Sequence, residues 1–470
     1  MIPLLLLACS PHTAPVQEPH ETGVPEDTGE PRENTLRSPA EAEDLDPAEG
    51  LVRVALSAGS LRREIWDPTT GRIRVVEGYA FNGQVPGPTI RLQKGDILTV
   101  DIENELDQPT TVHWHGLSVP YEMDGVTWTN EGIPAGGSFQ AVFTADEVGT
   151  FWYHPHHDSD RQVDLGLYGV VIVEDPAEPA ADRELVIVLD ADAEDPDSES
   201  TWEDTQTGVG SDPDLTHGAH GDAGSWLLNG LLAPTVELEV GERVRLRLLN
   251  ASNSAYAWLD TTGMPVLARD QGLLAEEWLP ERLLLAPGDR AELLWLPGPG
   301  GEAFQAWPYD RRGGDTQGPV QDLAVVALRG DGRAASMSFP HVFEAPTPDP
   351  GHTDVLWTFQ GEEHTDTWMI NGEQYPDVTI PVLAYGQEAI IEVRNLSATE
   401  HPFHLHGMSF EVLSEGGVAP QARLIEDTVN VPIHSAVRLR VLATNRGDWM
   451  AHCHILPHAH RGMMTVLRVE

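Results

Sequence analysis

The sequence predicts an all-β protein built from three similar antiparallel β-sandwich or barrel domains. Three observations lead to this fold class: short stretches of alternating apolar and polar residues, turn-forming Asn-Gly and Gly-Asp pairs between them, and an internal repeat about one domain long. The chain has 470 residues, of which 40% are hydrophobic, so it can form roughly two to four domains that each bury a core. No long stretch has the 3.6-residue period of an amphipathic helix.

The repeat has three copies, and each copy begins with an Asn-Gly pair and ends at an asparagine. The copies are Asn82–Asn104, Asn229–Asn250 and Asn371–Asn395. A second similarity follows 51 to 60 residues after each Asn-Gly pair, at Ile133-Pro134, Leu285–Gly288 and Val431-Pro432. Because both similarities recur at matching offsets, we expect three domains with the approximate limits 51–178, 182–335 and 350–470.

The residues before the first domain have a different character. Leu6-Leu7-Ala8-Cys9 resembles the bacterial lipobox, so residues 1–9 are interpreted as a lipoprotein-type signal peptide and Cys9 as a lipid anchor. The apolar run is far shorter than the roughly 20 residues of a membrane helix. Residues 10–50 are acidic and rich in Pro and Thr, which predicts a disordered tether. We therefore expect an exported protein, either periplasmic or a cell-envelope lipoprotein.

The charge balance excludes one class of partner. The formal net charge is −47, and Lys94 is the only lysine. Such a chain offers no basic surface that could displace counterions from nucleic acid. The two cysteines cannot form a disulfide framework across several domains.

Histidines gather in four clusters, all of them in the expected domains 51–178 and 350–470, which contain the first and third copies of the repeat. The clusters are His113-Trp114-His115, His154-Pro155-His156, His401-Pro402-Phe403-His404-Leu405-His406, and His452-Cys453-His454 followed by His458. Residues i and i+2 of a strand share a face, so each pair can grip a metal with two imidazoles. A single pair is more often a coincidence of the surface or packing, but four pairs in two of three copies favour a metal site.

Cys453 indicates a second site on the opposite face of its strand from His452 and His454. A thiolate, two imidazoles and a weak thioether describe blue copper, which predicts Cys453, His401, His458 and Met463 as ligands. The alternatives are a small buried apolar role for the cysteine and a core-filling role for the methionine.

These motifs resemble the three-domain multicopper oxidases of the laccase group, in which each domain has the cupredoxin fold. The phrases that carry the resemblance beyond the histidines are Pro86–Arg91, Met123–Val126, Gly149–His154 and Asp427–Pro432. The resemblance implies three cupredoxin-like Greek-key domains and four copper ions. It places type 1 copper at His401, Cys453, His458 and Met463, and type 2 copper at His113 and His404. It places the type 3 pair, between domains 1 and 3, at His115, His154, His156, His406, His452 and His454.

The resemblance also implies the reaction. A phenolic or similar aromatic donor would be oxidised one electron at a time near His458, and dioxygen would be reduced to water at the trinuclear cluster. Cys453 and its two histidine neighbours would connect the sites. Asp124 is either a proton-relay or electrostatic residue or a turn residue before Gly125. Many bacterial relatives carry an acid where this chain has Ala459, so we expect Asp124 or His460 to compensate.

Two other functions remain open at this stage. A metallo-oxidase of cuprous or ferrous ions suits the acidic charge, although the chain has no Met-rich insert. A metal-free structural protein with the cupredoxin fold is the remote alternative, because such proteins lack the ligands that this chain keeps.

Overall fold

The structure is a computed structural model. It describes residues 34–129, 132–176, 178, 180–192, 225–297, 304–307, 309–315, 320–329, 345–362 and 367–470. The expected signal peptide and Cys9 lie outside these residues. Among the described residues, none of the helices is long and apolar enough to cross a bilayer.

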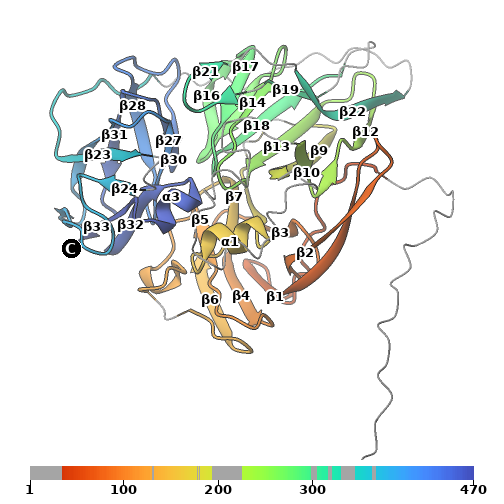
Figure 1. The fold of residues 1–470 in the computed structure, drawn as a ribbon, viewed down its shortest axis with the longest axis horizontal. Coiled ribbons are helices and arrows are strands. Elements are labelled where there is room, and N and C mark those ends of the chain that lie inside the picture. Colours follow the sequence, from red (N-terminus) through yellow and green to blue (C-terminus); the bar gives the residue numbers. More distant parts are fainter. Residues whose placement is uncertain are drawn as a thin grey trace, which may run out of the picture. The chain divides into compact units, whose positions relative to one another are not determined.

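In the described part of the chain, the strands form three pairs of larger sheets, one pair after another along the sequence (Figure 1). The first pair has the strand orders β2-β1-β4-β6 and β3-β8-β7-β5. Its elements are β1 (Leu51–Trp66), β2 (Ile73–Phe81), β3 (Gly87–Gln93), β4 (Ile97–Asn104), β5 (His113–His115), the short 3-10 helix η1 (Tyr121–Met123), β6 (Ser138–Thr144), β7 (Gly149–His154), α1 (Ser159–Asp164) and β8 (Gly169–Glu174).

The second pair has the orders β11-β10-β9-β13-β18-β15-β16 and β12-β22-β19-β14-β17, beside a small sheet of β20 and β21. Its strands are β9 (Arg183–Asp192), β10 (Ser225–Leu228), β11 (Leu231–Leu232), β12 (Thr235–Glu239), β13 (Val244–Asn250), β14 (Ala257–Asp260), β15 (Val266–Arg269), β16 (Gly272–Trp278), β17 (Arg282–Leu285), β18 (Arg290–Trp295), β19 (Phe304–Trp307), β20 (Tyr309–Asp310), β21 (Gly314–Asp315) and β22 (Gln321–Arg329).

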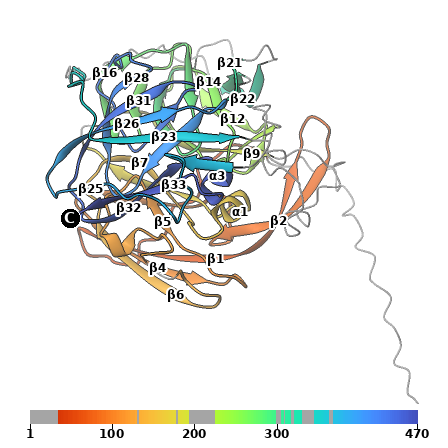
Figure 2. The ribbon, with the colours of Figure 1, turned by 60° about the vertical axis from the view of Figure 1, so that its left-hand side comes forward.

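The third pair has the orders β24-β23-β26-β31-β28-β29 and β25-β33-β32-β27-β30. Its elements are β23 (Val355–Glu362), β24 (Thr367–Ile370), β25 (Val382–Leu383), β26 (Glu388–Asn395), β27 (His401–Leu405), β28 (Phe410–Glu415), β29 (Ile425–Glu426), β30 (Thr428–Val431), β31 (Ala436–Leu442), β32 (Gly447–Cys453), α3 (Leu456–His460) and β33 (Met464–Val469). Helices α1 and α3, from the first and third pairs, lie side by side in both views (Figures 1 and 2).

The all-β prediction and its division into three sandwiches are confirmed, but the sheets are not purely antiparallel. Each sandwich contains two parallel strand pairs: β1 with β4 and β3 with β8, β9 with β13 and β12 with β22, and β23 with β26 and β25 with β33. Crossovers between the two sheets bring a strand back beside an earlier one in the same direction, which alternation along the sequence cannot reveal. The sequence limits of the domains stay a prediction.

The Asn-Gly pairs of the repeat make the same turn three times. Asn82, Asn229 and Asn371 have φ angles of 53°, 50° and 57°, and the glycine after each is also left-handed. Asn and Gly are the residues that adopt this backbone most readily. In the first copy, the Asn82 amide accepts a hydrogen bond from Ser57 N (2.7 Å) and donates one to Ala55 O (2.9 Å). The other two asparagines bond an earlier strand of their own copies in the same way.

The asparagines that end the copies join the two sequence similarities. Each donates its side-chain amide to the carbonyl of the residue that starts the second similarity: Asn104 to Ile133 (2.8 Å), Asn250 to Leu285 (2.9 Å) and Asn395 to Val431 (3.1 Å). All three are buried, and an unpaired amide there would cost stability. The repeat therefore preserves one buried asparagine hydrogen bond in each sandwich, which we call the asparagine joint.

The predicted tether is wrong for residues 35–50, which belong to the fold. Leu36 N donates to Thr235 O (2.8 Å) and Ala42 N donates to Thr89 O (2.8 Å), so this segment covers the edge strands β12 and β3. Leu36 is buried in the core of the second sandwich. One leucine and the unpaired backbone of two sheet edges suffice to hold a segment that is otherwise polar.

We expect Leu36→Ala to lower the unfolding temperature, because emptying a buried leucine site costs about 2–5 kcal/mol. Leu45→Ala is the matched control, since Leu45 lies in the same segment and is half exposed. Scanning calorimetry of both variants checks this. An equal effect of the two substitutions would contradict the docking of residues 35–50.

Candidate metal centres

Two strand pairs place the histidines opposite one another. In the first sandwich, β5 and β7 are antiparallel and His113 faces His154. In the third, β27 and β32 are antiparallel and His404 faces His452. His115 ends β5, and His406 and His454 follow directly after β27 and β32. His156 lies two residues after the end of β7. The predicted alternation therefore gathers two histidines from each strand or its end.

Eight histidines from the first and third sandwiches converge in one cluster. Their ring nitrogens lie within 4.8 Å of one another in overlapping groups of three: His113, His115 and His404; His113, His154 and His156; His115, His154 and His454; His156, His406 and His452. Seven of the eight side chains are buried, and His156 is partly buried. The structure thus brings together all eight of the histidines predicted for a trinuclear site.

Hydrogen bonds fix many of these rings through one nitrogen. His113 Nδ1 donates to the carbonyl of Asp124 and His404 Nδ1 donates to the carbonyl of Asp427, both at 2.8 Å. His115 donates through Nε2 to Asp427 Oδ1 (2.9 Å). The opposite nitrogens, Nε2 of His113 and His404 and Nδ1 of His115, are buried without a hydrogen-bond partner. Buried polar atoms rarely stay unpaired, so these nitrogens indicate a missing ligand.

Burial disfavours the charged form of seven of these eight imidazoles. Burial lowers the pKa of His452 to about 4, and burial also holds the pKa values of His115, His154, His404 and His454 well below the usual value. Neutral imidazole is the form that binds a metal ion. A proton therefore competes little with a metal ion for the nitrogens of these rings.

Asp124 belongs to this cluster as well as to a turn. Its carboxylate oxygens lie 3.1 and 3.2 Å from His406 Nδ1, and its carbonyl accepts from His113. It also ends η1 and precedes Gly125, whose added Cβ would lie 1.9 Å from Val112 O. Both interpretations of Asp124 thus have a structural basis. His460 does not reach the cluster: it is exposed and pairs with Asp160 of α1 at 3.3 Å.

The cysteine site lies on the other face of β32, as predicted. Cys453 Sγ is 3.4 Å from His401 Nδ1 and 3.7 Å from His458 Nδ1, and the two Nδ1 atoms are 3.2 Å apart. Met463 is buried, its carbonyl accepts from Cys453 N, and its own N donates to His458 O. The ligand atoms of His401, Cys453 and His458 therefore meet here, and the Met463 backbone bonds two of these residues.

The surroundings of His458 were not anticipated. The Trp368 indole stacks on its ring with centroids 3.6 Å apart, and Arg311 Nη1 lies 3.3 Å from its Nε2. Trp368, Arg311 and His458 are all buried. These two side chains therefore cover the ring of His458. Neither residue lies in a recognisable motif, so no pattern in a single sequence could have found them.

A buried thiolate–imidazole site beside a polyimidazole cluster, on a fold of three β-sandwiches, defines a protein built around copper redox centres. Models of the multicopper oxidase family match residues 66–178 and 347–470. Multicopper oxidase MmcO of Mycobacterium tuberculosis is 30% identical over 435 residues, which cover 84% of this chain and 83% of that protein. The chain belongs to the multicopper oxidase family, and it is a copper-dependent oxidoreductase that uses dioxygen.

Other relatives carry names that differ in substrate. The copper resistance protein A homolog of Pseudomonas syringae pv. tomato is 26% identical, over 85% of this chain and 90% of that protein. Among solved structures, the Campylobacter jejuni multicopper oxidase described as a metallo-oxidase superposes with a TM-score of 0.76 at 26% identity, covering 93% and 96% of the two chains. A laccase from Pediococcus acidilactici superposes with a TM-score of 0.77 at 25% identity, covering 94% of each chain. These likenesses confirm the cupredoxin-like fold.

We expect removal of copper with a chelator to lower the unfolding temperature, because the unpaired ring nitrogens regain a partner only when the metal binds. A ligand at 100 times its Kd stabilises the folded state by about 2.7 kcal/mol per site. Calorimetry before and after copper addition checks this. Magnesium is the control and should give no shift, since nitrogen and sulfur donors suit it poorly. Equal unfolding temperatures with and without copper would contradict the site.

Proposed function

We propose a laccase-like oxidase of phenolic or similar aromatic donors. In this proposal His401, Cys453, His458 and Met463 hold type 1 copper, and His113 and His404 hold type 2 copper. Two groups of three hold the type 3 pair: His115, His154 and His454, and His156, His406 and His452. The observation that carries the proposal is the convergence of ring nitrogens in the histidine cluster. Buried ring nitrogens without a hydrogen-bond partner there belong to His113, His115, His154, His156, His404 and His454.

Bound copper supplies the redox chemistry, which is one-electron oxidation of the donor and four-electron reduction of dioxygen to water. The chain's own residues hold the geometry. Cys453 is covalently joined to His452 and His454, so one strand links the two sites. Ser397 Oγ lies 2.7 Å from His401 Nε2 and fixes that ring with Nδ1 toward the sulfur. Asp124 orients His406 and adds a negative charge beside the cluster, and its role as a proton relay stays a prediction.

A cavity between the second and third sandwiches is the proposed docking site for the donor. It has a volume of about 490 Å³, and Trp258 and Trp278 contribute to its walls. Indole faces suit an aromatic ring. Asn430, also in the wall, donates to Glu400 Oε2 (2.6 Å), and Glu400 precedes the type 1 ligand His401. This short path connects the cavity with the cysteine site.

Oxidation of metal ions is the second candidate. The same cavity contains Asp289, Glu415 and Glu426, whose carboxylates could attract a cation. Arg269 pairs with Glu426 at 3.3 Å and with Asp289 at 3.5 Å, which partly neutralises them. The relatives named for copper resistance or described as metallo-oxidases also support this candidate. The aromatic walls lead us to place phenols first.

We also propose export, with Cys9 as a lipid anchor in a periplasmic or cell-envelope protein. This proposal rests on the lipobox-like Leu6-Leu7-Ala8-Cys9 alone.

We expect Cys453→Ser to lose the intense visible absorption of the copper-loaded protein, because that band needs a thiolate ligand. The copper at the histidine cluster should remain, as metal analysis can show. Met463→Leu is the control and should keep the blue colour, since it removes only the weak thioether. Blue colour in Cys453→Ser would refute the type 1 assignment.

We expect oxygen uptake by the copper-loaded protein to be faster with a phenol than with Cu(I) or Fe(II) at equal concentrations. Trp258→Ala should raise KM for the phenol, while Trp307→Ala should not. The Trp307 indole contacts the same Arg282 as Trp258 but does not line the cavity. An oxygen electrode measures all of these rates. Faster uptake with a metal ion would favour the second candidate, and no uptake with any donor would refute both.

A further inference from the structure

The second sandwich contributes no proposed copper ligand, yet one of its turns borders the histidine cluster. This turn connects β17 to β18 and contains Gly288. Gly288 has a φ of +91°, and an added Cβ would lie 3.1 Å from the ring of His454. The absence of a side chain there lets the turn approach a proposed type 3 ligand closely.

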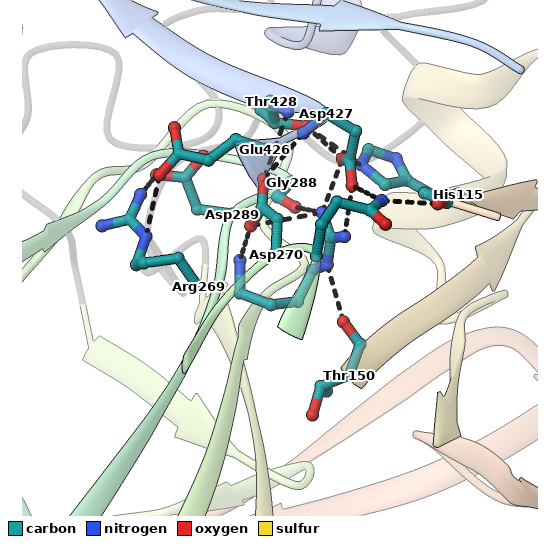
Figure 3. A network of polar contacts seen from close by, with 12 residues as sticks. His115, Thr150, Arg269, Asp270, Gly288, Asp289, Glu426, Asp427 and Thr428 are labelled. Atoms are coloured by element: carbon teal, nitrogen blue, oxygen red, sulfur yellow. Dashed lines mark hydrogen bonds and ion pairs between the residues drawn. The ribbon is translucent and has the colours of Figure 1, made fainter. Parts of the chain in front are cut away.

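Asp427 lies between β29 and β30 of the third sandwich and contacts both the histidine cluster and the second sandwich (Figure 3). Its Oδ1 accepts from His115 Nε2 (2.9 Å), and its backbone carbonyl accepts from His404 Nδ1 (2.8 Å). Asp427 therefore holds one proposed ligand from the first sandwich and one from the third. The orientation of both rings depends on where this aspartate lies.

Arg290, the first residue of β18, holds Asp427 in place. Its Nη1 and Nη2 donate to Asp427 Oδ1 and Oδ2 at 2.7 and 2.5 Å, which is a bidentate contact. Its Nε donates to Thr150 O (2.9 Å) on β7, the strand that ends at His154. The guanidinium of Arg290, in the second sandwich, thus contacts both the first and the third sandwich.

A glycine beside this contact leaves room for it. Gly116, directly after His115, has a φ of +88°, and an added Cβ would lie 2.6 Å from Arg290 Nη2 and 2.7 Å from Asp427 Oδ2. Arg290, Asp427 and the neighbouring Asp270 are almost fully buried. Burying such ions gains little stability over an apolar core, whereas removing one partner leaves an uncompensated charge. The network therefore has its main value in geometry.

We propose that Arg290 is a positioning residue for the trinuclear copper site, and that the second sandwich supplies the template on which ligands of the first and third are set. This inference rests on the ligand assignment in the proposed function. Arg290 acts through Asp427, which fixes His115 with Nδ1 and His404 with Nε2 free for copper. Loss of such an outer partner weakens metal binding by about 10- to 100-fold.

The test uses the full chain with Arg290→Met, which keeps length but removes charge and donors. Copper titration with metal analysis and electron paramagnetic resonance separates the sites. We expect the trinuclear ions to bind about 10- to 100-fold more weakly, while the blue type 1 signal stays at wild-type strength. Arg290→Lys keeps the charge without the bidentate fork, so its loss should be smaller. Should Arg290→Met fail to fold, the copper affinity of Arg290→Lys tests the proposal instead.

Arg247→Met is the matched control. Arg247 is equally buried, lies on the neighbouring strand β13 and contacts Thr150 Oγ1 at 3.2 Å, but it pairs with Glu292 and Glu184 instead of Asp427. We expect it to retain all the copper. Unchanged trinuclear affinity in both Arg290 variants, or an equal loss in Arg247→Met, would overturn the proposal. Absence of a blue signal in the wild-type protein would instead refute the proposed function.

Discussion

The constraint on which this structure depends is that eight imidazoles must be held close together in the interior without turning. Desolvation keeps protons off the rings, as the lowered pKa values show, but it also removes the water that could satisfy their nitrogens. Each ring can point one nitrogen at a metal only if something else holds the other. For four of the rings, two aspartates provide that hold through their carboxylates and backbone carbonyls: those of His113, His115, His404 and His406.

The two aspartates have parallel roles. The carbonyl of Asp124 accepts from His113, and the carbonyl of Asp427 accepts from His404, at the same distance of 2.8 Å. Their carboxylates reach across to the other sandwich, Asp124 to His406 and Asp427 to His115. Each sandwich therefore contributes histidines to the cluster and also an aspartate that hydrogen-bonds a histidine of the other sandwich. This crossing explains why the cluster forms only where both sandwiches meet.

Strand periodicity and the repeat allow much of this to be predicted from sequence. The His-x-His spacing specifies which side chains share a face, and Cys453 between two histidines specifies a second site behind them. Contacts that depend on how sandwiches pack are not encoded locally. Arg290 is 137 residues from Asp427, and Trp368 and Arg311 approach His458 from separate segments without a motif. Likewise, the polar composition of residues 35–50 gives no sign that they cover the edge strands of two sheets.

The three asparagine joints and the metal site differ in how far apart along the chain their partners lie. Each joint closes a chain segment of similar length, since donor and acceptor are 29, 35 and 36 positions apart in the sequence. Each of these contacts therefore lies within one sandwich and closes a short stretch of chain. The bond between His115 and Asp427 spans 312 residues and needs two finished sandwiches. The metal site thus needs contacts of about ten times the sequence separation that closes each sandwich.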